Sequence, residues 1–452
     1  APAPPAPAPT PTPSGTAILP GESIQAKVDA APAGTQFVLK PGVHRLQSVT
    51  PKDGNAFVGE PGAVLAGARL LTAFTREGAY WVAGGQTQES APHGSCWAAY
   101  PRCNRAHDLF RDDVPLRHVA SLAELGPGRW YFDYAADKIY LADDPAGHTV
   151  EASVTAQAFA GPASNVTVRG LVVEKYANPA QAGAIDAGRG AGWVVRDTEV
   201  RLTHGTGIRI GTRAQVVGNN VHDNGQLGVG GVGDNALVEN NTIAYNNRAG
   251  YDAGWEGGGT KFASTHDLVV RGNFVHHNQG PGLWTDIDNM RTLYEGNRVE
   301  DNRESGIFHE ISYDAVIRNN VVRRNGFGFS GWLYGAGILV SSSSNVEVVG
   351  NTVEDNAHGI TGIDQQRGTG RYGPWILLNL LVHQNTVRVG ATGKAAGVAG
   401  DLALFTAARN IRYRANRYQL GANPWPFEWD SRGLLEAGWR AAGQDADGTF
   451  TR

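Results

Sequence analysis

Short apolar segments recur along most of this 452-residue chain, and within each segment β-branched residues alternate with polar ones. Two examples are Leu268-Val269-Val270-Arg271-Gly272-Asn273 and Ala315-Val316-Ile317-Arg318-Asn319-Asn320. Alternation with a period of two favours a strand that buries one face. The pattern therefore predicts many short strands, each followed by Asn.

The segments form an internal repeat, marked by pairs of Asn five residues apart. The first members of successive pairs are separated by 22, 32, 24, 23 and 31 residues, which suits one solenoid coil with insertions in two coils. Asn tolerates left-handed turns, and stacked coils place Asn on Asn, so these residues predict structural ladders. Because crossovers between parallel strands are right-handed, we predict an all-β, right-handed parallel β-helix. The six pairs are Asn219/Asn224, Asn241/Asn246, Asn273/Asn278, Asn297/Asn302, Asn320/Asn325 and Asn351/Asn356.

The repeat divides the chain into five parts. Residues 1–16 are a Pro-rich tract, predicted to be a flexible linker, and 17–73 form an N-terminal cap and the first coils. Residues 74–152 are rich in Trp and Tyr and break the repeat, which indicates an inserted β-rich subdomain. The remaining coils run over 153–422, and 423–452 form a C-terminal cap. Ile24 to Ala31 is a short amphipathic helix candidate that would cover the first coil.

Composition narrows the function classes. A net charge of −4 leaves no basic footprint for nucleic acid, and no apolar run is long enough to span a bilayer. Cys96 and Cys103 lie close together and predict a local disulfide, with two free thiols as the alternative. The Pro-rich start and the cysteine pair favour an exported protein, either secreted or periplasmic and cell-surface. The oligomeric state stays open.

The register of the repeat brings two carboxylates together. Asp286 and Glu310 each lie 13 residues after the first Asn of their coil, so they occupy one column in adjacent coils. If Leu283, Ile287, Ile307 and Ile311 face the core, both carboxylates face outward, about 5 Å apart. That is the separation of nucleophile and acid/base in retaining glycosidases. A bound cation and chance stacking are the alternatives.

Further residues near this column are candidates for binding a saccharide substrate. They come from the preceding coil, from the strands that carry the carboxylates, and from two insertions that should project as loops. Glu256 precedes three glycines, where a ligand can approach the backbone, and His309 either packs in the core or orients Glu310. We predict no metal site. The substrate-binding candidates are Asp252, Glu256, Lys261, Trp284, Asp288, His309, Trp332, Tyr334, Gln365, Arg367 and Trp375.

The segment Trp284-Thr285-Asp286, followed by Gly306-Ile307-Phe308-His309-Glu310-Ile311 and Asn319-Asn320-Val321, resembles the catalytic stretch of the β-xylosidases of glycoside hydrolase family 120. The stretch from Trp130 to Leu141 is similar to the inserted β-subdomain of that wider group. The resemblance implies a right-handed β-helix glycosidase with Asp286 as nucleophile and Glu310 as acid/base, and needing no cofactor.

Two alternatives remain on the same fold. A polysaccharide lyase or uronate epimerase would use Lys261 or an Arg as base or charge neutraliser, with Ca²⁺ held by Asp286, Asp288 and Glu310. A non-catalytic glycan-binding solenoid would use the same loops without chemistry. An oligo- or polysaccharide is the expected partner in every case.

Overall fold

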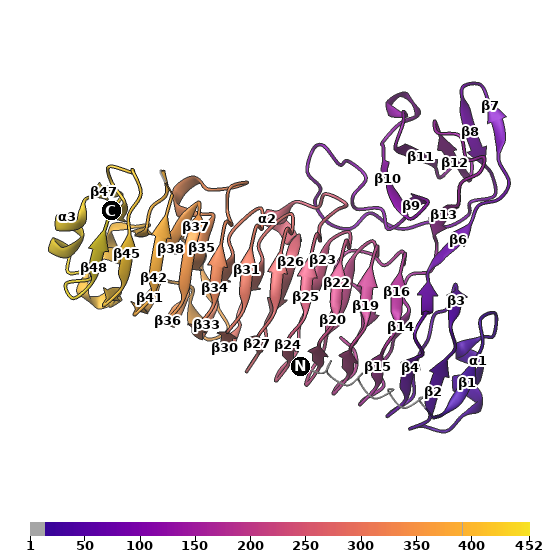
Figure 1. The fold of residues 1–452 in the computed structure, drawn as a ribbon, viewed down its shortest axis with the longest axis horizontal. Coiled ribbons are helices and arrows are strands. Elements are labelled where there is room, and N and C mark those ends of the chain that lie inside the picture. Colours follow the sequence, from indigo (N-terminus) through magenta and orange to yellow (C-terminus); the bar gives the residue numbers. More distant parts are fainter. Residues whose placement is uncertain (1–13, 391) are drawn as a thin grey trace, which may run out of the picture.

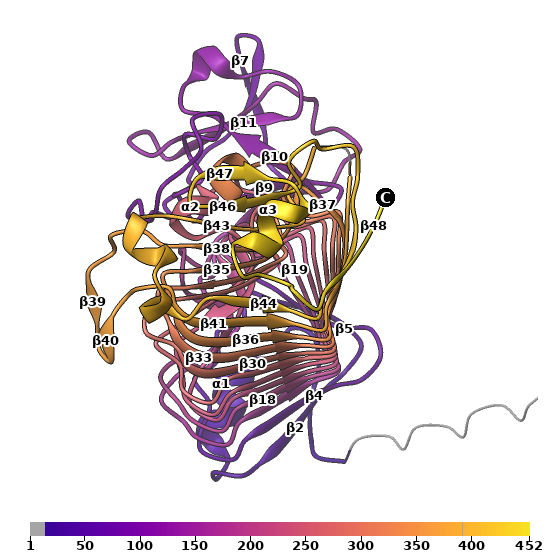
Figure 2. The same ribbon diagram turned by 90° about the vertical axis from the view of Figure 1, so that its left-hand side faces the viewer.

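The chain folds into a long parallel β-helix, seen in a computed structural model that describes residues 14–390 and 392–452 (Figures 1 and 2). Three sheets wrap around one core, and strands of successive coils pair in parallel. Of the predicted linker, residues 1–16, the first thirteen residues lie outside the described part of the chain. The first strand begins at Thr16, the last residue of the predicted linker. Among the described helices, none is both long and apolar enough to cross a membrane.

Sheet I has thirteen strands, in the order β1(Thr16–Ile18), β2(Gln36–Leu39), β4(Ala56–Gly59), β15(Thr167–Arg169), β18(Val194–Arg196), β21(Gln215–Val217), β24(Leu237–Glu239), β27(Val269–Arg271), β30(Met290–Glu295), β33(Tyr313–Arg318), β36(Ser344–Val349), β41(Leu378–His383) and β44(Arg412–Arg414). Sheet II has twelve strands, in the order β14(Phe159–Ala160), β17(Gly183–Asp186), β20(Thr206–Ile210), β23(Leu227–Gly231), β26(Gly258–Ala263), β29(Leu283–Asp286), β32(Ile307–Glu310), β35(Ala336–Ser341), β38(His358–Ile363), β43(Ala396–Ala399), β46(Phe427–Trp429) and β47(Arg432–Leu434). Among the described strands of sheet II, only the last pair, β46 and β47, is antiparallel.

Sheet III also has thirteen strands, in the order β3(Gly42–Arg45), β5(Ala63–Ala66), β16(Val172–Glu174), β19(Glu199–Arg201), β22(Asn220–His222), β25(Thr242–Ala244), β28(Phe274–His276), β31(Arg298–Glu300), β34(Val321–Arg323), β37(Thr352–Asn356), β42(Thr386–Val389), β45(Arg417–Gln419) and β48(Thr449–Thr451). The helices are α1(Ile24–Ala30), α2(Ala253–Glu256) and α3(Glu436–Ala441), with 3₁₀ turns at Leu122–Glu124, Gly331–Leu333, Leu402–Phe405 and Ala407–Arg409. The helix predicted near Ile24 is α1, which buries Ile24 and Val28 against the first coils.

Two ladders of buried Asn run along the helix and hold the coils in register. From Asn219 to Asn416, each side-chain Nδ2 of the first ladder donates to Oδ1 of the Asn one coil on, at 2.9–3.0 Å. The residue before each Asn has a positive φ, as Gly272 does at +64°, and in the first ladder Gly or Asn holds this position from Gly218 to Gly350. Since a buried amide costs free energy unless it is paired, the ladder strongly favours this register.

The Trp- and Tyr-rich stretch forms a separate eight-stranded sheet that projects from the N-terminal half of the β-helix (Figure 1). It begins before the predicted start at 74, and its order is β6(Ala68–Leu70), β13(Val150–Ser153), β9(Leu109–Arg111), β10(Val114–His118), β11(Arg129–Asp133), β12(Lys138–Leu141), β8(Tyr80–Ala83) and β7(Thr75–Glu77). Trp130, Phe132 and Ile139 belong to its own core. A half-buried ion pair joins it to the coils, with Arg248 Nη2 2.7 Å from Asp108 Oδ2.

A disulfide joins Cys96 to Cys103 in the segment between β8 and β9. Residue Cys96 also forms an antiparallel bridge with Tyr251, just before α2. The disulfide-bonded segment is therefore attached to the coil that precedes the predicted carboxylate column. A further small hairpin, β39(Thr369–Gly370) and β40(Gly373–Pro374), extends from the later coils (Figure 2).

Candidate active site

Asp286 and Glu310 end two neighbouring strands of sheet II. The register pairs Leu283 with Ile307, Trp284 with Phe308 and Thr285 with His309, so the two carboxylates follow in the same column. Leu283 and Thr285 are fully buried inside the coil, which places Trp284 and Asp286 on the outer face by alternation. The two carboxylates therefore lie in one column of adjacent coils, on the outer face of sheet II.

The outer face is covered here, so both carboxylates lie at the bottom of a cleft of about 700 Å³. Only 5% of Asp286 and 6% of Glu310 is exposed. The walls come from sheet II, α2, the insertion before β35 and the insertion that carries β39 and β40. The lining residues are Gln181, Ala253, Gly254, Trp255, Glu256, Lys261, Pro281, Trp284, Asp286, Ile287, Glu304, Ser305, Phe308, Glu310, Phe329, Tyr334, Gln365 and Arg367.

Asp286 is held by Lys261. The Lys261 ammonium lies 2.9 Å from Asp286 Oδ2, donates to the carbonyl of Trp255 at 2.9 Å, and sits 4.0 Å above the ring centroid of Trp284. The other oxygen, Asp286 Oδ1, is buried and has no hydrogen-bond partner among the described residues. A buried carboxylate oxygen without a partner is costly, and it is available to a ligand.

Glu310 has a different environment. Burial raises the pKa of Glu310 to about 7, and the negative charge of Asp286 adds to the increase, although the Arg367 ion pair opposes it. Arg367 Nη1 lies 2.7 Å from Glu310 Oε1. At neutral pH this carboxyl group can therefore hold or release a proton, which a general acid/base must do.

A chain of hydrogen bonds and ion pairs links the cleft to the inserted subdomain. Gln181 Nε2 donates to Glu256 Oε2 at 2.8 Å, and His93 Nε2 lies 3.0 Å from Gln181 Oε1. Glu256 in turn lies 3.8 Å from the Lys261 ammonium, and burial raises the pKa of Glu256. These contacts run in sequence from His93 through Gln181, Glu256 and Lys261 to Asp286. The inserted segment therefore helps to position the Asp286 carboxylate.

The structure brings most of the predicted binding residues to the cleft. Beside the two carboxylates, its walls include Glu256, Lys261, Trp284, Tyr334, Gln365 and Arg367. His309 does not reach it, because the imidazole is fully buried in the coil interior and bonded through Nδ1 to Thr285 Oγ1 at 2.7 Å. Burial lowers the pKa of His309 to about 3, so it stays neutral as a core residue.

Four other predicted residues lie outside the cleft lining. Asp252 caps α2 by accepting from the Gly254 amide at 2.9 Å. Asp288 accepts from Trp375 Nε1 at 3.0 Å and from the Arg371 amide at 3.0 Å, so this pair ties down the insertion that supplies Arg367. Trp332 stands further out, with its ring 6.4 Å from that of Tyr334.

One orientation was predicted wrongly, and several lining residues were missed. Ile287 is 40% exposed and lines the cleft rather than the core, because the chain turns into the left-handed region directly after Asp286. Gln181, Trp255, Glu304 and Phe329 were not among the candidates. Glu304 carried a usable signal, since it stands two residues before Gly306 in the Glu310 coil; burial raises its pKa to about 7.

Comparisons with known proteins agree on the fold. Residues 183–353 match a family model described as a right-handed β-helix region. No curated protein sequence matches the chain. Among solved structures, XylC in complex with xylose is similar at a TM-score of 0.71 and 16% identity, over 90% of this chain and 83% of that chain.

Two further structures have the same architecture. The A-module of the mannuronan C-5 epimerase AlgE4 from Azotobacter vinelandii is similar at a TM-score of 0.55 and 15% identity, over 95% of this chain and 92% of that chain. The catalytic unit of the GH87 α-1,3-glucanase from Streptomyces thermodiastaticus is similar at 0.51 and 10% identity, over 98% and 68%. At these identities the similarity shows the fold, and the chain is a right-handed parallel β-helix.

Proposed function

We propose that this chain is an exported glycoside hydrolase that cleaves glycosidic bonds by a retaining, two-carboxylate mechanism. The observation that carries the proposal is the pairing of Asp286 and Glu310 on adjacent strands at the bottom of one cleft. Strands about 4.8 Å apart suit the separation of about 5–5.5 Å that retaining glycosidases use. Two stacked carboxylates destabilise a sheet, so stability does not account for them.

The two groups divide the chemistry between them. In the first step Asp286 attacks the anomeric carbon while the glycosidic bond breaks and Glu310 gives its proton to the leaving oxygen. In the second step Glu310 takes a proton from water, whose oxygen attacks the anomeric carbon and displaces Asp286. Lys261 orients Asp286 through Oδ2 and leaves Oδ1 to attack. The pKa of Glu310, raised to about 7 by burial and by Asp286, suits both proton transfers.

Export and a saccharide substrate have separate support. The disulfide between Cys96 and Cys103 is of the kind that persists outside the cytosol. XylC binds xylose, and the GH87 protein is an α-1,3-glucanase, so two chains of similar fold act on or bind sugars.

The test compares Asp286→Ala and Glu310→Ala with Glu347→Ala, a half-exposed carboxylate on sheet I, on a panel of nitrophenyl glycosides. We expect kcat/KM to fall by about 10²–10⁴-fold in the two cleft variants and to stay within about twofold in the control. Azide should restore turnover in Asp286→Ala and give a glycosyl azide of inverted configuration. Near wild-type turnover in both cleft variants would refute the proposal.

A second candidate, a uronate lyase or epimerase, is favoured by one feature, the pair of cations Lys261 and Arg367 in the same cleft. AlgE4 shows that a chain of this fold can act as an epimerase. Both cations, however, already bind carboxylates of the cleft. Incubation with polymannuronate separates the candidates, since an ultraviolet-absorbing unsaturated product or C-5 inversion would favour the second.

A further inference from the structure

Five aromatic side chains form a continuous track that leads out of the cleft. Trp284 and Phe308 stack with ring centroids 5.6 Å apart, and Phe308 meets Tyr334 edge-on at 6.3 Å. Tyr334 then contacts Phe329 at 5.1 Å and Trp332 at 6.4 Å. We call these five residues the aromatic track. It starts on the cleft floor beside the carboxylates and ends on the insertion before β35.

The outer end of the track is exposed although it is firmly held. Phe329 is 50% exposed and Trp332 is 46% exposed. Leu333, which lies between Trp332 and Tyr334 in the sequence, is buried. The Leu333 carbonyl accepts from Thr361 Oγ1 at 3.0 Å, and Tyr334 Oη accepts from Gln365 Nε2 at 2.9 Å. Large apolar rings presented to solvent from an anchored loop mark a ligand surface.

The backbone of this loop supports the same interpretation. Trp332 and Leu333 both have positive φ, +49° and +66°, which costs free energy in residues with bulky side chains. The strained pair turns the Leu333 side chain inward and leaves the Trp332 ring outside. Stability alone does not explain an arrangement that is strained and also exposes two rings.

The track also has a direction relative to the reaction. Glu310 belongs to the coil on the C-terminal side of Asp286, and the track leaves the cleft on that side, through Tyr334. At the opposite side, Trp255 closes the cleft, packed between Tyr251 and His93 of the disulfide-bonded segment. Because Glu310 would protonate the leaving oxygen, the leaving group must lie on the side of the track.

We infer that the aromatic track binds the leaving-group sugars of an oligo- or polysaccharide, which stack their apolar faces on Tyr334, Phe329 and Trp332. The inference rests on the proposed function and adds the length of the substrate and its polarity along the β-helix. Sugar rings present flat C–H faces that pack against aromatic rings in the way apolar groups do. A single terminal sugar would not reach the outer rings.

The experiment measures kcat/KM for wild type, Phe329→Ala, Trp332→Ala and the double variant. The probes are xylo-, α-1,3-gluco- and mannurono-oligosaccharides of two to six residues, and xylosyl and glucosyl fluorides, whose leaving group is one atom. Tyr245→Ala serves as control, since Tyr245 is a half-exposed aromatic residue directly after β25 of sheet III. We expect each track variant to lose about three- to tenfold on the longer oligosaccharides, and nothing on the fluorides.

The outcomes separate two kinds of failure. If the oligosaccharides are hydrolysed and the track variants show unchanged chain-length dependence, the inference is wrong and the proposed function stands. If the variants instead change the oligomeric state in gel filtration with no kinetic effect, the exposed rings form a contact between copies of the chain. If wild type hydrolyses neither fluorides nor any oligosaccharide, and Glu310→Gln binds none of them in calorimetry, the proposed function fails together with the inference.

Discussion

Glu300 and Glu310 end strands that follow each other in the chain, β31 of sheet III and β32 of sheet II, and they are buried almost equally, at 3% and 6% exposure. Their pKa values nevertheless move in opposite directions. Burial alone would raise both, but hydrogen bonds from Arg298 and Arg324 outweigh it and lower the pKa of Glu300. Glu310 has one Arg partner and the negative Asp286 in the preceding coil, and its pKa rises to about 7.

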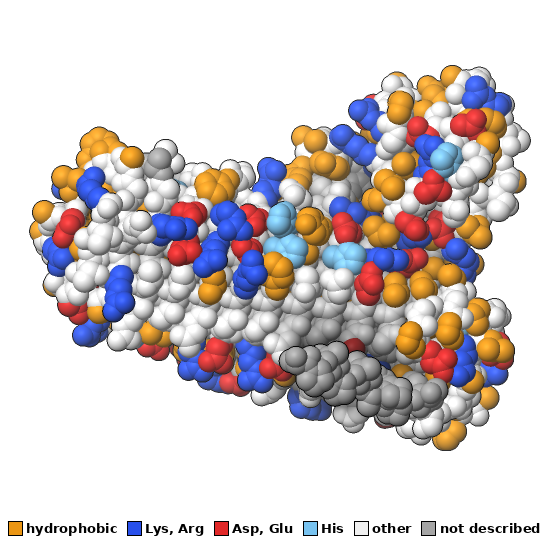
Figure 3. Space-filling model, in the orientation of Figure 1, with side chains coloured by type: hydrophobic (Ala, Val, Ile, Leu, Met, Phe, Trp, Pro, Cys, Tyr) orange, Lys and Arg blue, Asp and Glu red, His pale blue; other side chains and the backbone are white. Residues whose placement is uncertain are grey.

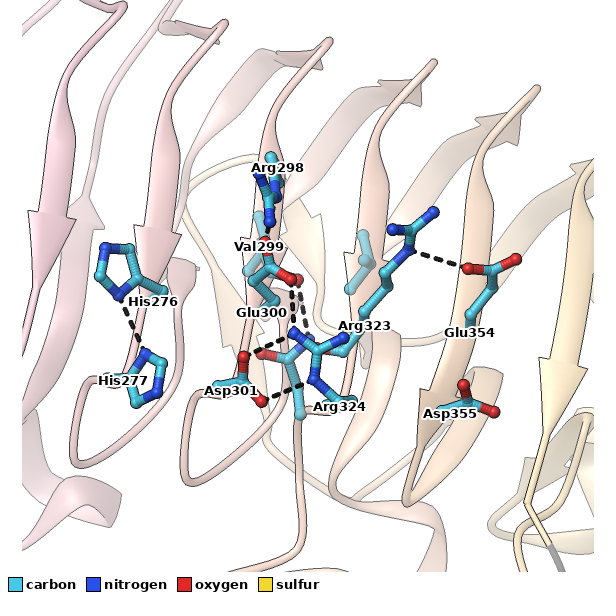
Figure 4. Close-up of polar contacts among 12 residues, drawn as sticks. His276, His277, Arg298, Val299, Glu300, Asp301, Arg323, Arg324, Glu354 and Asp355 are labelled. Atoms are coloured by element: carbon cyan, nitrogen blue, oxygen red, sulfur yellow. Dashed lines mark hydrogen bonds and ion pairs between the residues drawn. The ribbon is translucent and has the colours of Figure 1, made fainter.

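The columns to which the two glutamates belong explain this difference. On sheet III the register stacks Glu300 on Arg323, Arg323 on Glu354 and Glu354 on Arg388, so charges of opposite sign alternate from coil to coil. Figure 4 shows ion pairs of this face, including Arg324 Nη2 at 2.6 Å from Glu300 Oε2 and Arg323 Nε at 2.8 Å from Glu354 Oε2. Figure 3 shows acidic and basic side chains intermixed over these strands.

On sheet II the corresponding stack holds two carboxylates in succession. Opposite charges on neighbouring strands stabilise a sheet, and like charges destabilise it. The same solenoid thus carries a column whose charges satisfy each other and a column whose charges need external partners. A buried carboxylate therefore points to function only when its neighbours in the column fail to neutralise it.

The largest stability effect that sharpens this comparison is expected from the matched pair Glu300→Gln and Glu310→Gln. Glu300→Gln removes the acceptor of two guanidinium groups, so it should cost about 1–3 kcal/mol of unfolding free energy at pH 8. Glu310→Gln should instead stabilise the protein at pH 8, by about 1–2 kcal/mol, because it removes a carboxylate that is charged there at a cost. Urea unfolding of both variants and wild type measures the two shifts.

The pH dependence gives this pair its own control. Because the pKa of Glu310 is raised in the folded protein, this group contributes to stability only while it is protonated. Its contribution is fully present below pH 4.5, the ordinary pKa of an unfolded Glu, and is lost as the pH rises through about 7. The advantage of Glu310→Gln should therefore shrink between pH 8 and pH 5. The lowered pKa of Glu300 means that its contribution is present above pH 4.5 and is lost only on further acidification. Parallel pH curves for the two variants would contradict the comparison.

An effect of intermediate size, on the pH dependence of activity, is expected from Arg367→Met. This substitution removes the Arg partner of Glu310, whereas Glu300 keeps two Arg partners. The Arg367 guanidinium lowers the pKa of Glu310, so its removal should raise that pKa further. The alkaline limb of kcat/KM, near pH 7 in wild type, should move to higher pH by about one unit. Arg371→Met, in the same insertion but paired with the Tyr372 ring, should leave the limb in place. A limb that stays fixed in Arg367→Met would assign it to another group.

Sequence periodicity was enough for the fold and for the carboxylate column because both depend on the coil repeat. The Asn ladders require one register, and counting from Asn273 and Asn297 places Asp286 and Glu310 side by side. The alternation rule failed at Ile287 because the strand ends at Asp286 and the next residues turn with positive φ. The alternation of inward and outward side chains predicts the direction of a side chain only within the strand itself.

The cleft walls could not be predicted in this way. Gln181, Trp255 and Phe329 come from turns and insertions that no repeat describes, and His93 arrives from the inserted subdomain through the bridge between Cys96 and Tyr251. The binding role expected for Asp288 and Trp375 came from their place in the chain. Their mutual hydrogen bond, which sets the insertion carrying Arg367, depends on a contact across 87 positions.

The smallest expected effect concerns Arg324, which binds both Glu300 and Asp301 on the face shown in Figure 4. Its side chain is 48% exposed, so water screens both ion pairs, and Glu300 keeps Arg298 when Arg324 is removed. Arg324→Ala should therefore cost less than about 1 kcal/mol, and the cost should fall as salt is raised from about 0.1 M to 1 M. Urea unfolding at the two salt concentrations measures it. A loss as large as that of Glu300→Gln would mean that the alternating column acts as one cooperative network, in which every guanidinium group is needed. The difference between this column and the cleft would then come from how the charges are connected, and not from the sign of the neighbouring charge.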